Sequence, residues 1–592
     1  MSPSPNPAEA FAAAERAFLE HRFGDARAIL GSLAGLAHPA VHHLRAIVEH
    51  ELGDLSSARE QFEAAARLAP ADPQLWNNFG ILLEQIDDLP AALAAYERAL
   101  HLSPALTDAM FNRGVLLNRL GRRAEARQVF ESLIRPQPGN ARFWNGLAVV
   151  EKEDGDLKAA AAAYDRALEA SPGDALATIG RARVALERQE PDAAERYRTA
   201  RRLAPGNLEL ALDEAEARLD AGDRAALDDL AALARAAPDW TAGQIALARM
   251  RWEQGDIAGF TDHVEALLES RPESGALWRD YVHLLANCGE PARAADAALR
   301  ARSETPDDGA FQLAEAIHAG KAGQIERAEA LFATLRVGVP GRDLNESVHR
   351  IRRGELDRAL ALIEAVLEAE RWNLAAWGIA EVLYRKLGRA RAEWLSGQPG
   401  LVGVSDLSLD RGDFDAADRL LAQLHEHTVE TVGQSVRDGT QTRWNLFDRV
   451  EPELAVLHAA IRRALDDHVA RLPARDDQHP LLRHRDRRMK VSASWSVRFL
   501  AAGHHVAHYH PSGLISSACY FRTPPPGTDR EGWLEIGRPP EDFLLDLEPI
   551  EFVEPKPGRL VLFPSYLFHG TRPFAAGERM SVAFDVSAGE DR

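Results

Sequence analysis

The sequence predicts a multidomain chain: an N-terminal all-α solenoid over residues 7–395, then a β domain over residues 431–592. Three observations predict this division. A proline recurs about every 34 residues in the first part, a glycine recurs between these prolines, and both series stop near residue 395. After about residue 430, short segments of alternating apolar and polar residues take their place. We therefore expect helical repeats followed by a separate sheet domain.

The proline spacing defines the helical repeat. Four prolines are each 34 residues apart, and five more continue at intervals of 33 or 34: Pro70, Pro104, Pro138, Pro172, Pro205, Pro238, Pro272, Pro306 and Pro340. Glycines such as Gly121, Gly155 and Gly289 mark the middle of the units. Because glycine can end a helix in the left-handed conformation and proline cannot continue one, each unit predicts helix, tight turn, helix and break. About eleven such hairpins fit the region.

Small and aromatic residues recur where the two helices of a hairpin would pack, for instance Gly80, Ala92 and Tyr96. This pattern resembles the tetratricopeptide repeat over about residues 7–395. The resemblance implies a superhelix whose concave face binds a protein or peptide partner. The aromatic positions are expected to be core. Three asparagines resemble residues that line the groove of such repeats: Asn77, Asn112 and Asn145.

Composition and charge limit the partners and the cellular compartment that we expect. The chain has 70 Lys and Arg against 90 Asp and Glu, a net charge of −20, which disfavours nucleic acid and anionic lipid as partners. It has only two cysteines, Cys288 and Cys519, so no disulfide framework is indicated and a reducing compartment fits. We see neither a secretory signal nor an apolar run long enough to span a bilayer. A cytoplasmic protein is expected, with its oligomeric state open.

Residues 396–430 read as a linker with a capping helix at about 411–427. An apolar helix is predicted at 452–465. Six short strands are predicted beyond it, at 492–499, 505–510, 516–521, 533–536, 559–563 and 581–586. Strands at this spacing favour a jelly roll, that is, a double-stranded β-helix.

One cluster of residues in this domain carries chemistry. His508 and His510 share parity, so on a strand they would project from the same face about 7 Å apart. A third imidazole, His569, ends a later apolar strand, and Arg579 begins the last one. Two imidazoles on one face can converge on a metal, and a guanidinium offers two parallel donors to a carboxylate. His504 and His505 are expected in a turn or on the surface.

These segments resemble the iron(II)- and 2-oxoglutarate-dependent dioxygenases, and most closely the 2OG-Fe(II) oxygenase family that often follows tetratricopeptide repeats in bacterial proteins. The resemblance rests on SWSVRF, HYHPSGLISSACYF, GRLVLFPSYLFHGTRPF and ERMSVAF. It implies Fe(II) and 2-oxoglutarate as cofactors, with no catalytic residue beyond the metal ligands. His508 and His569 match ligands of the metal. Residues matched to the oxoacid are Arg579, Ser581 and Tyr520.

The middle ligand departs from the family pattern, because His510 occupies the position of the carboxylate in H-x-D/E. A neutral imidazole there leaves the site one unit more positive. This could retune iron, admit zinc, or leave His510 outside the ligand set with water in its place.

Three functions therefore stay open at this stage. The first is a 2-oxoglutarate-dependent hydroxylase with a repeat array that binds a protein or peptide. The second is a non-catalytic scaffold or adaptor with a degenerate β domain. The third is a three-histidine metal dioxygenase that does not use 2-oxoglutarate. Arg498 could reach the pocket or a surface carboxylate, the basic run at 483–490 is expected to be a solvated face, and Cys519 is expected in the core.

Overall fold

The structure is a computed structural model that describes residues 6–305, 309–426, 433, 435–525 and 529–589, without the side chains of 501–502. It contains two compact units, Met1–Ala185 and Leu186–Arg592, which are treated separately below. Within the described residues, no helix combines the length and the apolar character needed to cross a membrane.

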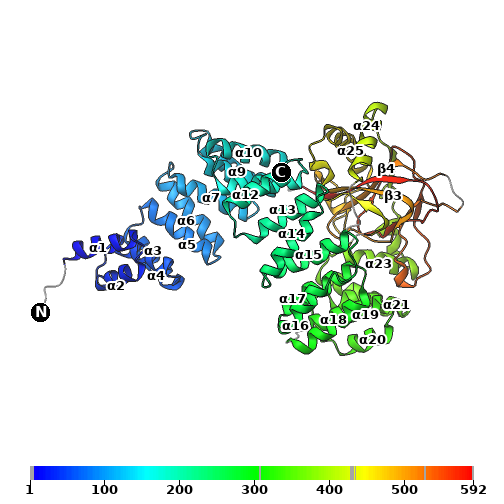
Figure 1. Ribbon diagram of the computed structural model, residues 1–592, viewed down its shortest axis with the longest axis horizontal. Helices are drawn as coiled ribbons and strands as arrows, with labels where there is room; N and C mark the ends of the chain where they lie inside the picture. Colours follow the sequence, from blue (N-terminus) through cyan, green and yellow to red (C-terminus); the bar gives the residue numbers. More distant parts are fainter. Residues whose placement is uncertain (1–5, 306–308, 427–432, 434, 526–528, 590–592) are drawn as a thin grey trace. The chain divides into compact units, whose positions relative to one another are not determined.

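The first unit consists of helices, of which α1 to α10 each pack on their neighbours along the chain, and α11 runs across its end at Ala185. They are α1 (Pro7–Leu19), α2 (Phe23–Ser32), α3 (Pro39–Glu51), α4 (Leu55–Leu68), α5 (Pro73–Gln85), α6 (Leu89–Leu102), α7 (Thr107–Arg119), α8 (Arg123–Ile134), α9 (Ala141–Glu153), α10 (Leu157–Ala170) and α11 (Ala175–Glu187). Figure 1 shows them as successive hairpins, coloured from blue to cyan. The helical part of the predicted fold class is confirmed.

The hairpin α5–α6 shows why these sequences form such pairs. Asp72 caps α5 by accepting hydrogen bonds from two backbone amides of the first turn, and proline occupies the first helical position. At Gly80, a Cβ atom would lie 2.5 Å from the ring of Tyr96 in the facing helix, so only glycine allows this close packing. The expected core role of Tyr96 fits its exposure of 1%.

The three predicted groove asparagines make hydrogen bonds between repeats. Asn112 donates to Asn77 (3.0 Å), and Asn145 donates to Asp174 (3.1 Å). Asn77 is buried and also donates to its neighbour Asn78. The amide groups of these asparagines therefore tie successive repeats together.

The second unit continues the hairpins and then adds the sheets. Its helices before the sheets are α12 (Ala193–Leu203), α13 (Leu208–Asp220), α14 (Ala225–Ala236), α15 (Thr241–Glu253), α16 (Asp262–Ser270), α17 (Gly275–Asn287), α18 (Pro291–Glu304), α19 (Ala310–Lys321), α20 (Ile325–Thr334), α21 (Arg342–Arg352), α22 (Leu356–Ala369) and α23 (Leu374–Lys386). A short π-helix at Glu393–Gly397 follows.

Among the residues that the structure describes, nine strands form two antiparallel sheets. They are β1 (Gly403–Asp406), β2 (Val436–Gln441), β3 (Met489–His505), β4 (Ile515–Arg522), β5 (Leu534–Ile536), β6 (Glu551–Val553), β7 (Arg559–Pro564), β8 (His569–Thr571) and β9 (Arg579–Ala588). The larger sheet has the order β1-β7-β4-β9-β3-β2, and the smaller has the order β6-β5-β8. Helices α24 (Arg411–Leu424) and α25 (Pro452–Arg471) pack on each other beside this sheet domain (Figure 1).

Most predicted elements of the β domain appear, with one correction. The predicted strand at 505–510 is wrong, because β3 ends at His505. Beyond it the chain keeps one isolated bridge, between His508 and His569. Residues 506–510 turn away from the β3 ladder because their amides at 506, 508 and 510 bond to three different segments, at Ser435, His569 and Ser565.

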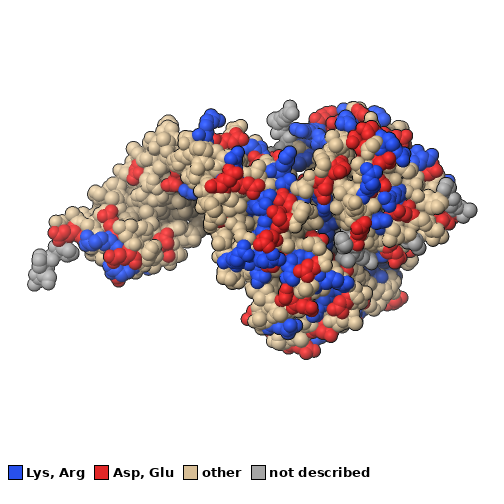
Figure 2. Space-filling model, turned by 45° about the horizontal axis from the view of Figure 1, so that its top comes forward, with Lys and Arg blue, Asp and Glu red and all other residues tan. Residues whose placement is uncertain are grey.

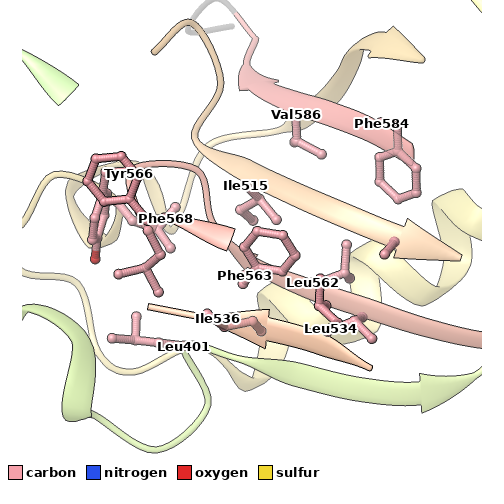
Figure 3. Close-up of a cluster of buried hydrophobic side chains, with 14 of the residues drawn as sticks. Leu401, Ile515, Leu534, Ile536, Leu562, Phe563, Tyr566, Phe568, Phe584 and Val586 are labelled. Carbon is pink, nitrogen blue, oxygen red and sulfur yellow. The ribbon is translucent and has the colours of Figure 1, made fainter. Parts of the chain in front are cut away.

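One hydrophobic core joins the last repeat helices to the sheets. Its buried members run from Ile351 in α21 to Val586 in β9. Figure 3 shows the part of this core formed by Phe563, Phe568 and neighbouring aliphatic residues. At Gly378 in α23, a Cβ atom would lie 2.6 Å from the carbonyl oxygen of Tyr566, so the helix backbone lies directly against the sheet domain.

Polar contacts reinforce this packing. Arg443 pairs with Asp220 of α13 and with Glu253 of α15. Arg352 of α21 pairs with Asp542, and Lys386 of α23 donates to the carbonyl of Asp546 (2.7 Å). On the face drawn in Figure 2, acidic and basic side chains alternate without a continuous basic area, as expected for a chain of net charge −20.

Candidate metal centre

Three histidines converge between the two sheets. Candidate ligand atoms of His508, His510 and His569 all lie within 4.8 Å of one another. The backbones of His508 and His569 exchange two hydrogen bonds, of 3.0 and 2.8 Å, and the amide of His510 donates to the carbonyl of Ser565 (3.0 Å). These bonds fix the positions from which the three rings project. The structure thus brings together the three residues singled out in the sequence as metal ligands.

Backbone carbonyls determine which nitrogen carries the proton in two of the three rings. Nδ1 of His508 lies 2.8 Å from the carbonyl oxygen of Val506, and Nδ1 of His569 lies 3.0 Å from that of Leu567. A carbonyl oxygen only accepts, so each Nδ1 carries the proton and each Nε2 keeps its lone pair. Proteins orient metal-binding histidines by such bonds to the second ring nitrogen.

Burial favours the neutral form of two of the three rings, His508 and His569. It lowers the pKa of His508 to about 4 and that of His569 well below its ordinary value, and the neighbouring histidines lower both further. Near neutral pH these two imidazoles are therefore neutral, the form that binds a metal cation.

An anion lies directly behind the third ring. Asp585 accepts a hydrogen bond from Nδ1 of His510 (2.5 Å) and another from the hydroxyl of Ser516 (2.7 Å). The register of β4 and β9 places Ser516 opposite Asp585. Asp585 shares strand parity with Arg579 and Ser581, so one face of β9 carries all three side chains.

Two nitrogens of the guanidinium on this strand face lack partners. Arg579 is 2% exposed, and its Nε and Nη1 atoms make no hydrogen bond within the described structure. The hydroxyl of Tyr520 is also buried without a partner, and the Arg579 guanidinium carbon lies 5.1 Å from the centre of that ring. A buried, unpaired cation is costly, and a carboxylate that accepts two parallel N–H bonds would satisfy it. The residues therefore fit the far carboxylate of a 2-oxoacid.

Comparisons with known families agree with this geometry. Residues 493–585 match a family model described as "Putative 2OG-Fe(II) oxygenase". Residues 43–107, 77–141, 111–175 and 145–207 match the model described as "Tetratricopeptide repeat". The chain therefore carries tetratricopeptide repeats within residues 43–207 and, at residues 493–585, a domain that matches the oxygenase family model. This domain, with the segments from residue 435 onward that pack around it, is called the oxygenase domain below. A search of curated proteins finds no match.

Solved structures resemble the chain at low identity. PilF from Pseudomonas aeruginosa is 19% identical, with a TM-score of 0.32, and the match covers 36% of this chain and 97% of PilF. MamA from Desulfovibrio magneticus RS-1 is 19% identical, with a TM-score of 0.27 and coverage of 28% and 96%. The C-terminal part of a TPR repeat-containing protein from Cytophaga hutchinsonii is 18% identical, with a TM-score of 0.32 and coverage of 43% and 98%. Scores this low say nothing about function.

The oxygenase domain places two more histidines beside the centre. His504 and His505 both belong to β3, and the ring of His505 lies 5.6 Å from that of His508. The hydroxyl of Ser435 bridges these two rings, 3.1 Å from Nδ1 of His505 and 3.2 Å from Nε2 of His508. The expectation that His504 and His505 lie in a turn or on the surface is therefore wrong, because both are half-buried residues of β3.

Other residues from the sequence analysis have structural roles. Arg498 pairs with Glu578, and Arg483 of the basic run stacks on Trp372, with 3.6 Å from its guanidinium carbon to the ring centre. Cys519 is fully buried, which raises the pKa of its thiol to about 12. Its expected place in the core is confirmed.

The segment 439–442 holds β2 against β3. The amide of Thr442 donates to the carbonyl of Ser496, and the Thr442 hydroxyl accepts from the amide of Ser496 (both 2.9 Å). The hydroxyl of Thr440 contacts Nδ1 of His425 in the turn after α24 (2.8 Å). This segment supports the strand that leads to the metal centre.

A cavity of about 650 Å³ opens beside the metal centre of the oxygenase domain. One wall comes from α19, α21 and α23, through residues such as Leu344, Val348 and Ile379. The opposite wall includes Phe568 and the candidate ligand His508. We call this cavity the repeat–oxygenase cleft.

Proposed function

We propose that this protein is an Fe(II)- and 2-oxoglutarate-dependent dioxygenase that hydroxylates a C–H bond of its substrate. The observation that carries the proposal is the buried guanidinium of Arg579, which has unpartnered nitrogens on the same strand face as Asp585, the partner of the three-histidine cluster. Most buried polar groups of a protein core have a hydrogen-bond partner, whereas Arg579 has two guanidinium nitrogens without one.

One group of residues would bind the metal, and another group would bind the oxoacid. His508, His510 and His569 would hold iron through their Nε2 atoms, and Arg579 would bind the far carboxylate of 2-oxoglutarate, with Ser581 beside it and Tyr520 bordering the oxoacid. Iron bound together with 2-oxoglutarate supplies the activation of dioxygen, with succinate and carbon dioxide as co-products. Burial of Arg579 and Tyr520 excludes water from the carboxylate and strengthens its hydrogen bonds.

Asp585 supplies the negative charge that the ligand set lacks. The usual non-haem iron centre of this kind has two histidines and one carboxylate. Here His510 takes the carboxylate position, and Asp585 hydrogen-bonds to its far nitrogen. Through this bond the aspartate makes His510 a more basic ligand and lowers the positive charge of the site, since an outer carboxylate acts on a metal through the ligating imidazole.

The repeats serve the binding of a protein or peptide. The helices α13, α15, α21 and α23 contact the oxygenase domain of the same chain, and α19 lines the cleft, so the array beyond residue 186 builds the substrate side of the site. We expect the repeats of the first unit to bind a protein or peptide partner on their concave face. The two buried, free cysteines suit a reducing compartment such as the cytoplasm.

A second candidate follows from the donor set itself. Three histidines could also serve a metal dioxygenase that acts directly on its substrate without an oxoacid. Such an enzyme would leave the buried guanidinium of Arg579 without a ligand, which is why the first function is preferred.

The test is an anaerobic titration of 2-oxoglutarate into the Fe(II)-loaded protein, followed through the visible charge-transfer band of an iron-bound oxoacid. The wild type should show the band, and Arg579→Ala should abolish it while retaining iron. Arg498→Ala is the matched control, because it removes a guanidinium of the same domain that already pairs with Glu578. Iron binding without a band would support the oxoacid-free enzyme, and absence of iron binding would leave the scaffold function.

A further inference from the structure

We infer that the repeat–oxygenase cleft binds an extended peptide and receives one bulky aliphatic or aromatic side chain beside His508. This inference rests on the proposed function and names the substrate class of the same site. Its volume of about 650 Å³ lies in the range of pockets that enclose organic ligands, and it has room for more than one side chain.

The lining of the cleft favours an apolar side chain. Apolar residues contribute from both walls: Ile317, Phe332, Leu344, Val348, Ile379, Phe543 and Phe568. The charged residues of the lining are four basic and three acidic ones. Two pairs form among them: Arg352 pairs with Asp542, and Arg538 pairs with Glu535 (2.8 Å). The lining therefore offers apolar burial and little net charge to a ligand, and apolar burial is what binds an uncharged side chain.

The backbone on the oxygenase side favours a peptide over a free molecule. The amides of residues 506, 508 and 510 are hydrogen-bonded within the protein. In the described structure, the amide and carbonyl groups of Ala507 and Tyr509 make no such bond, and both residues line the cleft. An open backbone edge of this kind pairs with an extended peptide, as in recognition by strand addition.

A buried polar atom also lacks a partner in the cleft. Thr571 is 4% exposed, and its hydroxyl makes no hydrogen bond within the described residues. It lines the cleft at the end of β8, two residues beyond the candidate ligand His569. A ligand with backbone donors and acceptors would satisfy this hydroxyl, because a buried hydroxyl gains free energy when it is paired.

The two walls are fixed to each other, so the cleft is preformed. Arg385 of α23 donates to the carbonyls of Gly537 and Glu548, on the oxygenase side. Together with the pair between Arg352 and Asp542, these bonds tie α21 and α23 to the segment 537–548. A preformed site loses little free energy on ordering when a peptide binds.

The test uses labelled pentapeptides, acetyl-Gly-Ser-X-Ser-Gly-amide with X as Phe, Leu, Asp or Lys, and the full-length protein without metal. Fluorescence anisotropy should give dissociation constants about tenfold lower for Phe and Leu than for Asp and Lys, since burying such a side chain is favourable. N-methylation at X should weaken binding about two- to tenfold through the loss of a backbone hydrogen bond.

Val348→Trp, which fills the cleft, should weaken binding of the Phe peptide about tenfold, because a tryptophan there displaces the apolar side chain. Leu299→Trp is the control, because Leu299 is 45% exposed on α18 and is not a cleft residue. Equal binding of the four peptides, no detectable binding, or an unchanged constant in Val348→Trp would overturn the inference. Acetyl-Phe-amide binding as tightly as the pentapeptide would overturn the peptide assignment. Because metal is absent, these outcomes are separate from any failure of iron or oxoacid binding.

Discussion

Asp585 offers the sharpest test of the metal centre. Asp585→Asn keeps an oxygen that can accept from Nδ1 of His510 and from Ser516, but it removes the negative charge. Loss of a partner behind a metal-binding histidine weakens metal affinity by about 10- to 100-fold, or about 1.4–2.7 kcal/mol. We expect the loss of metal affinity to be near 10-fold for Asp585→Asn and near 100-fold for Asp585→Ala. The loss is larger for alanine because it also removes the hydrogen bond that orients the ring of His510.

The assay is an anaerobic titration with Co(II), whose visible spectrum reports the ligand geometry, alongside Fe(II) affinity and the iron reduction potential. Asp585→Asn should keep the Co(II) spectrum and raise the potential, because a site with one negative charge fewer favours Fe(II) over Fe(III). Asp406→Asn is the control, since it removes the same charge from a residue of β1 whose side chain is 84% exposed. Wild-type affinity and potential in Asp585→Asn would refute the reasoning that this carboxylate compensates for His510.

Three further predictions concern stability and are measured by thermal unfolding. Gly378→Ala should destabilise the protein by about 1–3 kcal/mol, because its Cβ would meet the carbonyl oxygen of Tyr566 at 2.6 Å. Arg443→Ala should cost about 2 kcal/mol, because it removes a partner from Glu253, whose side chain is 1% exposed. Burial lowers the pKa of His468 to about 4, so the unfolded chain binds this proton more tightly, and stability should fall by up to about 1.4 kcal/mol per pH unit as pH drops from 6.5 towards 4.

Each stability prediction has its own control. Gly173→Ala adds a Cβ where no atom lies within 4 Å, and it should leave the melting temperature unchanged. Arg411→Ala removes a solvent-exposed pair within α24, which should contribute little. For the histidine, His468→Gln should reduce the pH dependence; a dependence equal to that of the wild type would assign it to other buried histidines. Unchanged melting of Gly378→Ala or Arg443→Ala would show that the repeats and the oxygenase domain do not support each other.

Much of the architecture could be predicted from the sequence because it is periodic. Proline and glycine recur at the spacing of one hairpin, and alternation of apolar residues identifies β4, β7 and β9. The candidate metal site could be predicted in part for a similar reason. His508, His569 and Arg579 lie at the spacing of a recognisable pattern, and the structure places the two histidines within ligand distance of each other.

The features that could not be predicted depend on contacts between residues that are distant in the sequence. Asp585 is 75 residues from His510, and only strand pairing brings them together. Its parity with Arg579 and Ser581 on β9 was the one available signal. The cleft had no signal of this kind, because Val348 and His508 face the same cavity from different parts of the chain. The predicted strand at 505–510 failed because tertiary bonds to Ser565 and His569 replace a regular ladder.

The continuous core from Ile351 to Val586 limits how this protein can change during evolution. A domain with its own hydrophobic core can be transferred from one chain to another by recombination and still fold. Here, cutting the chain near residue 395 would expose the apolar surface that Trp377 and Leu383 share with Phe568. The last repeats are therefore inherited together with the sheets, and new partner specificities can arise most freely in the hairpins of the first unit.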